Sequence, residues 1–251
     1  MIHSFLMIGQ SNMAGRGFIN EVEPIKNEHL KVLRNGRWQT MYTPVNPDRE
    51  WAGISLAESF ALAYHNDKGV DVGLIPCADG GTSIDQWRPG GLLFDNAIYQ
   101  ARLAMRTSTI AGVLWHQGSA DCPSHLWPHY EQKLNMMLDE LQRQLGLYDV
   151  PILLGGLGDF LSKYRVGTWE LENAPRINDQ LQRIAKNREM TGFVSAKGLT
   201  DNPDHLHFNA RSLREFGYRY YDKYLELEDK NKKFCEKFCE DDAIRTELEL
   251  L

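Results

Sequence analysis

The sequence predicts an α/β fold, a three-layer α/β/α sandwich built on a parallel sheet of about five strands. Short apolar runs alternate with longer stretches whose apolar residues recur at helical spacing. Such alternation is typical of βαβ units with helices on both faces of a parallel sheet. The 251 residues are 42% hydrophobic and 25% charged, which is the ordinary composition of one globular domain with a sizeable core.

Local patterns along the chain define the expected elements. Five apolar runs bounded by turn-forming residues are predicted strands: residues 2–8, 70–76, 110–115, 150–154 and 192–196. Five amphipathic stretches are predicted helices: residues 55–67, 94–106, 127–144, 175–187 and 210–225. Ser55 and Glu58 form a capping-box pattern at the start of the first of these helices. The order of the elements predicts one domain over residues 1–225.

Two segments do not fit this alternation. Residues 21–51 contain Pro24, Pro44 and Pro47 and are expected to form an excursion that walls the functional site. Residues 226–251 are dense in Glu, Asp and Lys, yet their apolar residues recur at helical spacing. This charged C-terminal helical tail either packs on the domain as a solvated helix or forms a subunit contact in a homo-oligomer. The sequence leaves both open.

Charge and hydropathy argue against two classes of partner. The formal net charge of -6 and the lack of basic stretches interleaved with aromatic residues argue against a nucleic-acid surface. No apolar run approaches the roughly 20 residues needed to span a bilayer, so no membrane partner is expected. The first predicted strand starts at Ile2 and leads directly into the predicted site, so a cleavable leader would remove part of that site. The chain is therefore expected to be either cytoplasmic or a mature form whose leader is absent, and the Met start favours a cytoplasmic protein.

The four cysteines do not form a disulfide framework. Cys77 follows a predicted strand and is expected to be a small core residue. Cys235 and Cys239 are one helical turn apart, but no second pair of ligands accompanies them. No metal site is predicted.

Ser11 stands where the first predicted strand ends. The apolar run stops at Gly9 and continues as Gln10-Ser11-Asn12-Met13, and open α/β sheets bind ligands at the carboxyl ends of their strands. A serine at this edge can be a nucleophile. Ser11 or Asn12 can equally be a helix cap. The segment alone does not separate the two interpretations.

An acid and an imidazole occur near the other end of the domain, in Asp204-His205-Leu206-His207. A serine hydroxyl needs a base to remove its proton, and a carboxylate behind the base fixes the tautomer of the imidazole. Ser11, Asp204 and His207 therefore supply the parts of an acyl-transfer triad. His205 is the rival base, and the spacing from Asp204 favours His207.

Two further segments follow predicted strands. Gly80-Gly81 is either a turn that needs a positive φ or a turn that brings backbone N–H groups close to a ligand. Gln117 is either an ordinary polar residue at a strand end or a donor on the same sheet edge as Ser11. Independent donors that converge on one edge favour a functional site.

Four strings carry a family resemblance: GQSNM at residues 9–13, GGTSIDQW at 80–87, WHQG at 115–118 and DHLH at 204–207. Together they resemble the SGNH hydrolase superfamily, most closely the branch that holds carbohydrate esterase family six and the sialate O-acetylesterases. The resemblance runs from Ile2 to about Tyr224 and implies a flavodoxin-like fold. Four motifs in the expected order are a specific signal, whereas any one of them would be weak.

By this resemblance Ser11 is the nucleophile, His207 the general base and Asp204 the carboxylate that orients it. The oxyanion hole is implied to consist of the backbone N–H of Ser11, a backbone N–H of the Gly80-Gly81 turn and the side-chain amide of Gln117. No cofactor is implied, and the chemistry rests on side chains and backbone alone.

Residues in or beside the motifs are expected to bind substrate, namely Gln10, Asn12, Trp87 and His116. Trp87 and Trp127 are the tryptophans best placed to stack on a sugar ring, whereas Trp38 and Trp51 are expected in the core or the wall. One departure from the pattern stands beside WHQG. Relatives usually read WHQGE, but here Ser119 takes the place of the glutamate, and Asp121 keeps a second acid nearby.

The resemblance implies a serine esterase that removes O-acetyl groups from a carbohydrate, such as an acetylated oligosaccharide or sialic acid, through an acetyl-enzyme intermediate. The expected partner is a small acetylated sugar. One alternative is an esterase or thioesterase acting on non-sugar short acyl esters, and another is a carbohydrate-binding protein without turnover. The intact Ser, Asp and His argue against the binding protein, and Ser119 argues for it.

Overall fold

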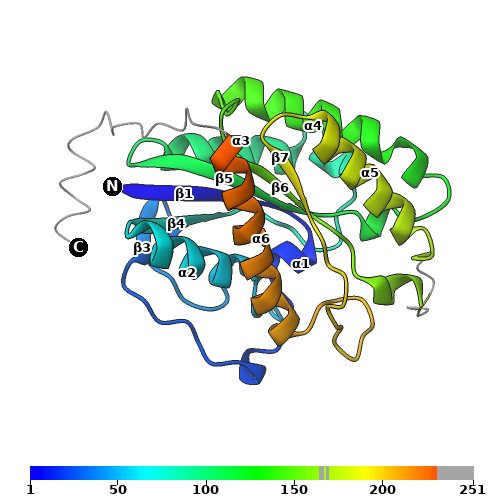
Figure 1. Cartoon of the computed structure of the whole chain (residues 1–251), viewed down its shortest axis with the longest axis horizontal. Coiled ribbons are helices and arrows are strands. Elements are labelled where there is room, and N and C mark those ends of the chain that lie inside the picture. Colours follow the sequence, from blue (N-terminus) through cyan, green and yellow to red (C-terminus); the bar gives the residue numbers. More distant parts are fainter. Residues whose placement is uncertain (164–166, 168–169, 231–251) are drawn as a thin grey trace.

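The computed structural model describes residues 1–163, 167 and 170–230 of the chain. In Figure 1 a sheet lies between two layers of helices, which is the three-layer α/β/α sandwich expected from the sequence. The strands and helices alternate along the chain after β3, so the βαβ pattern read from the sequence is confirmed.

Seven strands form the sheet in the described residues, in the order β3-β2-β4-β1-β5-β6-β7. Their bounds are β1 Ile2–Gly9, β2 Leu30–Arg34, β3 Arg37–Thr40, β4 Asp71–Pro76, β5 Ser108–His116, β6 Ile152–Gly155 and β7 Thr191–Val194. All neighbouring strands are parallel except β2 and β3. β1 and β5 are buried along nearly their whole length, as expected for strands covered by helices on both faces.

The helices divide between the two faces of the sheet, with α2 (Leu56–Lys68) and α6 (Ala210–Lys230) on one face and α3 (Leu92–Ala104), α4 (Tyr130–Leu145) and α5 (Ala174–Asn187) on the other (Figure 1). The predicted capping box of Ser55 and Glu58 starts α2. The backbones of α2 and α6 approach closely at Gly217, where a Cβ would lie 2.1 Å from Oγ of Ser59. A larger residue at this position would push the two helices apart.

The strand count differs from the expected five because the excursion, residues 21–51, contributes β2 and β3. The two strands form a hairpin across Asn35 and Gly36, whose φ angles are 51° and 76°. Positive φ at both positions suits a two-residue hairpin turn, and Asn-Gly is the strongest short sequence signal for such a turn. This dipeptide could have revealed the hairpin in a segment whose prolines suggest an irregular loop.

The strand order reverses beside β1. The strands up to β4 lie on one side of β1, and the chain then crosses to β5 on the other side. Such a switch point leaves a crevice at the carboxyl ends of the strands, where open α/β sheets bind ligands. Ser11, the Gly80-Gly81 turn and Gln117 follow these three strands and meet at this edge.

The rest of the chain bears on the other sequence predictions. The predicted boundary at residue 225 stays a prediction: α6 continues through Lys230, and residues 231–251 lie outside the described residues, with Cys235 and Cys239 among them. Cys77 is buried as expected, and burial raises the pKa of its thiol to about 12.

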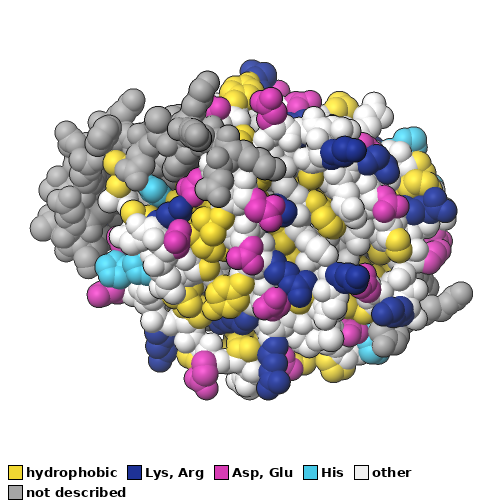
Figure 2. All heavy atoms as spheres, viewed as in Figure 1, with side chains coloured by type: hydrophobic (Ala, Val, Ile, Leu, Met, Phe, Trp, Pro, Cys, Tyr) yellow, Lys and Arg dark blue, Asp and Glu magenta, His cyan; other side chains and the backbone are white. Residues whose placement is uncertain are grey.

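None of the helices in the described ranges has the length and apolar character that crossing a membrane requires. On the face seen in Figure 2, charges of both signs are interspersed.

Candidate active site

Ser11 is the first residue of the short helix α1 (Ser11–Ala14), directly after β1. The turn between them needs Gly9, whose φ is 124° and whose Cβ would lie 2.3 Å from the carbonyl oxygen of His116. The same carbonyl accepts a hydrogen bond of 2.9 Å from the N–H of Gln10. The sharp turn leaves the Ser11 side chain free of a capping role, because Gln10 occupies the position before the helix.

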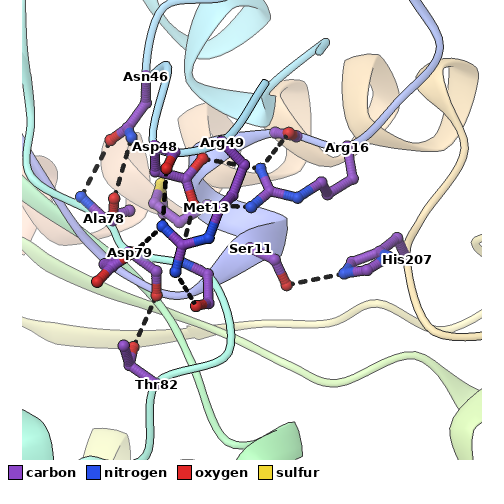
Figure 3. A network of polar contacts seen from close by, with 12 residues as sticks. Ser11, Met13, Arg16, Asn46, Asp48, Arg49, Ala78, Asp79, Thr82 and His207 are labelled. Atoms are coloured by element: carbon purple, nitrogen blue, oxygen red, sulfur yellow. Dashed lines mark hydrogen bonds and ion pairs between the residues drawn. The ribbon is translucent and has the colours of Figure 1, made fainter. Parts of the chain in front are cut away.

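The Ser11 hydroxyl faces His207, as Figure 3 shows. Nε2 of His207 lies 2.9 Å from Oγ of Ser11, and Nδ1 of His207 lies 2.7 Å from Oδ2 of Asp204. With its proton on Nδ1, the imidazole donates to Asp204 and leaves Nε2 to accept from the serine. This is the arrangement that a serine nucleophile and its base require.

Asp204 is anchored on its other oxygen. Oδ1 accepts hydrogen bonds from the backbone N–H groups of Leu206 at 2.9 Å and His207 at 3.0 Å. Partial burial raises the pKa of the Asp204 carboxyl, but the hydrogen bonds from the His207 ring and from these N–H groups outweigh it and lower the pKa to about 2. The carboxylate is therefore ionised across the neutral range and can stabilise a protonated imidazole.

The rival base, His205, has a different partner. Its Nδ1 lies 2.6 Å from Oδ2 of Asp201, and its φ of 55° places it in the left-handed region. Of the two histidines, only His207 is within hydrogen-bond distance of Ser11 in the described contacts. The structure therefore brings together the three residues that the sequence singled out, and it pairs His205 with Asp201.

The Gly80-Gly81 turn lies beside the nucleophile. A Cβ on Gly80 would be 3.5 Å from Cβ of Ser11 and 2.4 Å from Nη2 of Arg16, so only glycine fits there. The N–H of Gly80 donates to Oδ2 of Asp48 at 2.8 Å, so it does not face a substrate. Gly81 is exposed with a φ of 80°, and neither its N–H nor that of Ser11 has an acceptor among the described residues. Expecting a donor at Gly80 is therefore wrong, and Gly81 offers one.

Gln117 does not have the role expected of it. The side chain is fully buried, at 0% exposure. Its Nε2 donates to the carbonyl oxygen of Thr82 at 2.9 Å and to Oδ2 of Asp121 at 2.5 Å. Both amide hydrogens are thus used inside the protein, and none remains for an oxyanion. Gln117 instead braces the Gly80-Gly81 turn through Thr82.

A scan against family models matches residues 1–226 to the carbohydrate esterases described as sialic acid-specific acetylesterases. The chain belongs to this family. Members are carboxylic ester hydrolases, and the residues that the four sequence strings contribute to the crevice lie within the matched range.

Individual relatives agree with this assignment. The "Probable carbohydrate esterase At4g34215" of Arabidopsis thaliana is 26% identical over 247 residues, which cover 88% of this chain and 89% of the relative. A solved structure of that Arabidopsis protein has a TM-score of 0.79 at 24% identity, covering 93% of this chain and 99% of its own. The structure of NanS has a TM-score of 0.70 at 15% identity, covering 91% and 98%. At these identities the structures show the shared fold.

In this esterase Gln10 binds protein and not substrate. Its Oε1 accepts from the N–H of Gly118 at 3.1 Å, and its Nε2 donates to the hydroxyl of Ser119. Ser119, which replaces the glutamate expected after WHQG, thus still supplies an acceptor for Gln10. Assigning Gln10 to substrate binding is corrected, because its amide is buried and joins the residue before the nucleophile to the loop after β5.

Asn12 also acts within the protein. Its Oδ1 accepts from the N–H of Phe208 at 3.1 Å, and its Nδ2 donates to the carbonyl oxygen of Leu206 at 3.5 Å. The amide therefore binds the backbone on both sides of His207 and holds the base next to Ser11. Assigning Asn12 to substrate binding is corrected for this reason.

The two remaining candidates for substrate binding are core residues. Trp87 is fully buried, donates from Nε1 to Oγ1 of Thr82 at 3.1 Å and packs edge-on against Trp115. His116 is also buried, with Nε2 3.1 Å from the carbonyl oxygen of Gly156, and burial lowers its pKa to about 4. Both side chains are thus buried and hydrogen-bonded within the protein, which does not favour a role in substrate binding.

Three charged residues near the nucleophile were not predicted from the sequence. Figure 3 shows Arg16, Asp48 and Arg49 in one network beside Ser11. Arg16 lies shortly after the GQSNM string, and Asp48-Arg49 lies in the excursion that was expected to wall the site. Asp48 and Arg49 could have been predicted, because they are charged residues in a segment expected to line the functional site.

Proposed function

We propose that this protein is a serine acetylesterase that removes O-acetyl groups from a carbohydrate through an acetyl-enzyme intermediate. The observation that carries the proposal is the continuous hydrogen-bonded chain from Ser11 through His207 to Asp204, with distances of 2.9 Å and 2.7 Å. Membership in the carbohydrate esterase family supports the reaction class.

In the proposed reaction Oγ of Ser11 attacks the carbonyl carbon of the acetyl ester while Nε2 of His207 takes its proton. The tetrahedral intermediate collapses as the bond to the sugar oxygen breaks, and His207 returns the proton to that oxygen. A water molecule then attacks the carbonyl carbon of the acetyl-enzyme while His207 takes its proton; the bond to Oγ of Ser11 breaks, acetate leaves, and His207 returns the proton to Oγ. Asp204 stabilises the imidazolium in both steps.

Two backbone donors are available to the oxyanion. The N–H groups of Ser11 and Gly81 have no acceptor among the described residues and stand on adjacent strand ends at the same edge of the sheet. Donors fixed in advance at the place where negative charge develops are a major source of rate enhancement in acyl transfer. Gln117 contributes by holding the Thr82 carbonyl oxygen.

The proposed substrate is a small acetylated sugar, either an acetylated oligosaccharide or an O-acetylated sialic acid. The family description names sialic acid. XAC1771, a carbohydrate acetylesterase from Xanthomonas citri, has a solved structure with the same fold; its TM-score is 0.66 at 17% identity, covering 90% of this chain and 56% of its own.

The test compares wild type with Ser11→Ala on acetylated xylo-oligosaccharides, O-acetylated sialic acid and p-nitrophenyl esters of increasing length. Wild type should release acetate from a sugar and hydrolyse p-nitrophenyl acetate much faster than the octanoate. Ser11→Ala should lose at least ~10³-fold in kcat while keeping its circular dichroism spectrum, because triad members act as a unit. A serine-directed phosphonate should label Ser11 alone. An active Ser11→Ala protein would contradict the proposal, and a preference for long acyl chains would shift it to non-sugar esters.

A further inference from the structure

Side chains from the excursion bind the turn that lies beside Ser11. Asn46 accepts from the N–H of Ala78 and donates to its carbonyl oxygen, both at 3.0 Å. Asp48 accepts from the N–H of Gly80 at 2.8 Å, and Arg49 donates to the carbonyl oxygen of Gly80 at 3.0 Å. In Figure 3, Asn46, Asp48 and Arg49 lie beside Ala78 and Asp79. The backbone polar groups of Ala78 and Gly80 are thus held by side chains.

Asp48 is itself fixed by a buried ion pair. Nη1 and Nη2 of Arg16 donate to its two carboxylate oxygens at 2.9 Å and 2.7 Å, and both side chains are only 4% exposed. Arg16 also donates to the carbonyl oxygen of Gly15, directly after α1. A bidentate ion pair of this kind has a defined geometry. Its net contribution to stability is often small, because both charges lose their hydration. Its main consequence is the relative position of the segments it joins.

The joined segments are the two that offer N–H donors to the oxyanion. Arg16 follows the helix that begins with Ser11. Asp48 binds the N–H of Gly80, the residue directly before Gly81. On the other side of Gly81, Gln117 holds the carbonyl oxygen of Thr82 at 2.9 Å. Gly81 therefore lies between two fixed peptide units, although its own surroundings are open: a Cβ on it would meet no atom within 4 Å.

We propose that the Arg16–Asp48 ion pair positions the oxyanion hole: by binding the N–H of Gly80 it aims the N–H of Gly81 at the oxygen of the tetrahedral intermediate. Asp48 is a positioning residue, because it acts through Gly80 and does not touch the substrate. This inference rests on the proposed function, since it concerns the transition state of the same ester hydrolysis.

The expected effect is on kcat. A donor works when it lies about 2.7–3.1 Å from the oxyanion, and a displacement of about 1 Å can cost on the order of 10²-fold in rate. Because the donor interacts mainly with the transition state, its displacement lowers kcat and leaves ground-state binding nearly unchanged.

The test measures p-nitrophenyl acetate hydrolysis by Asp48→Ala, which removes the acceptor for the N–H of Gly80. We expect kcat to fall ~10- to 100-fold, with KM within about threefold of wild type. The rate of inactivation by a serine-directed phosphonate should fall in parallel, because its phosphoryl oxygen occupies the same hole. A change in structure alone would not separate kcat from KM in this way.

A matched control is available in a second buried ion pair. Nη1 of Arg214 lies 2.7 Å from Oε2 of Glu58, and both side chains are largely buried. Glu58→Gln should lower the melting temperature through the unpaired Arg214, yet keep kcat near that of wild type. Should Asp48→Ala fail to fold, the double variant Arg16→Gln/Asp48→Asn keeps neutral hydrogen-bonding groups in place of the two charges. It should still lose ~10-fold in kcat, because single hydrogen bonds replace the bidentate pair.

The proposal is overturned if folded Asp48→Ala, or the double variant, has a kcat equal to or above that of wild type. The N–H of Gly80, released from Asp48, would then be the true donor. Failure of the proposed function is distinguishable from this result, because it would appear in wild type itself as the absence of Ser11-dependent acetate release.

Discussion

Two segments at the carboxyl edge of the sheet carry similar residues and differ in what they can do. The histidine loop, residues 201–208, presents His207 to Ser11 with the side chain 16% exposed. The WHQG segment, residues 115–118, also has a histidine and a polar neighbour, but His116 and Gln117 are 1% and 0% exposed. The His207 ring reaches the nucleophile, whereas both hydrogens of the Gln117 amide are used by protein acceptors. The two motifs therefore differ in what their polar atoms contact: His207 contacts the serine hydroxyl, whereas Gln117 contacts only groups inside the protein.

The largest effect expected from this comparison is in the histidine loop. Asp204→Asn should lower kcat about 10⁴-fold if the loop behaves as protease triads do, because an amide favours the wrong imidazole tautomer. His205→Ala is the matched control, since His205 pairs with Asp201 and has no contact with Ser11 among those described. It should stay within a few-fold of wild type in steady-state kinetics. A dead His205→Ala enzyme with an active His207→Ala enzyme would reverse the assignment.

Asp121, the buried acid that Gln117 contacts, should affect stability more than rate. Burial raises the pKa of Asp121 to about 6, well above the ordinary value for an aspartate, although hydrogen bonds from Gln117 and from the N–H of Ile84 oppose it. Because the folded protein binds this proton more tightly than the unfolded chain, the stabilisation is present at low pH. It is lost as pH rises from about 4 to about 6, and amounts to about 3 kcal/mol.

Asp121→Asn removes this ionisation and keeps an oxygen acceptor for Gln117. Its free energy of unfolding in urea should therefore rise relative to that of wild type between pH 4 and pH 7, by up to about 3 kcal/mol. kcat should change little, because Asp121 is buried and lies behind Gln117. Parallel stability profiles for the two proteins would show that Asp121 ionises normally in the folded state.

The smallest effect concerns the outer wall of the site. Trp51 is 69% exposed and lies two residues after Arg49, which contacts the turn beside Ser11, whereas Trp38 and Trp87 are buried. An exposed indole at this position can stack on a sugar of an oligosaccharide substrate. Trp51→Ala should raise KM for acetylated xylo-oligosaccharides about fivefold, equivalent to about 1 kcal/mol, and leave p-nitrophenyl acetate hydrolysis unchanged. Equal effects on both substrates would place Trp51 in a structural role.

The sequence could predict features that depend on local patterns, but not those that depend on contacts between distant residues. The five longer helices and five of the strands follow from local periodicity, and each was predicted to within a few residues. β2 and β3 were missed because they are short and lie in a segment with three prolines, although Asn35-Gly36 marked the turn. For the site, the motifs selected the residues that meet at the crevice. The motifs could not show that the N–H of Gly80 and the side-chain amide of Gln117 already donate to groups of the protein. Their acceptors, on Asp48 and Thr82, come from distant parts of the chain.

Asn12 binds the backbone on both sides of His207 across a sequence separation of 196 residues to Phe208. During translation Ser11 and Asn12 follow β1, whereas the histidine loop emerges after every described strand. A nascent chain can therefore assemble its whole sheet while the serine still lacks its base. On the proposed function, hydrolysis requires the loop to return to α1, so we expect esterase activity only after synthesis of this domain is nearly complete.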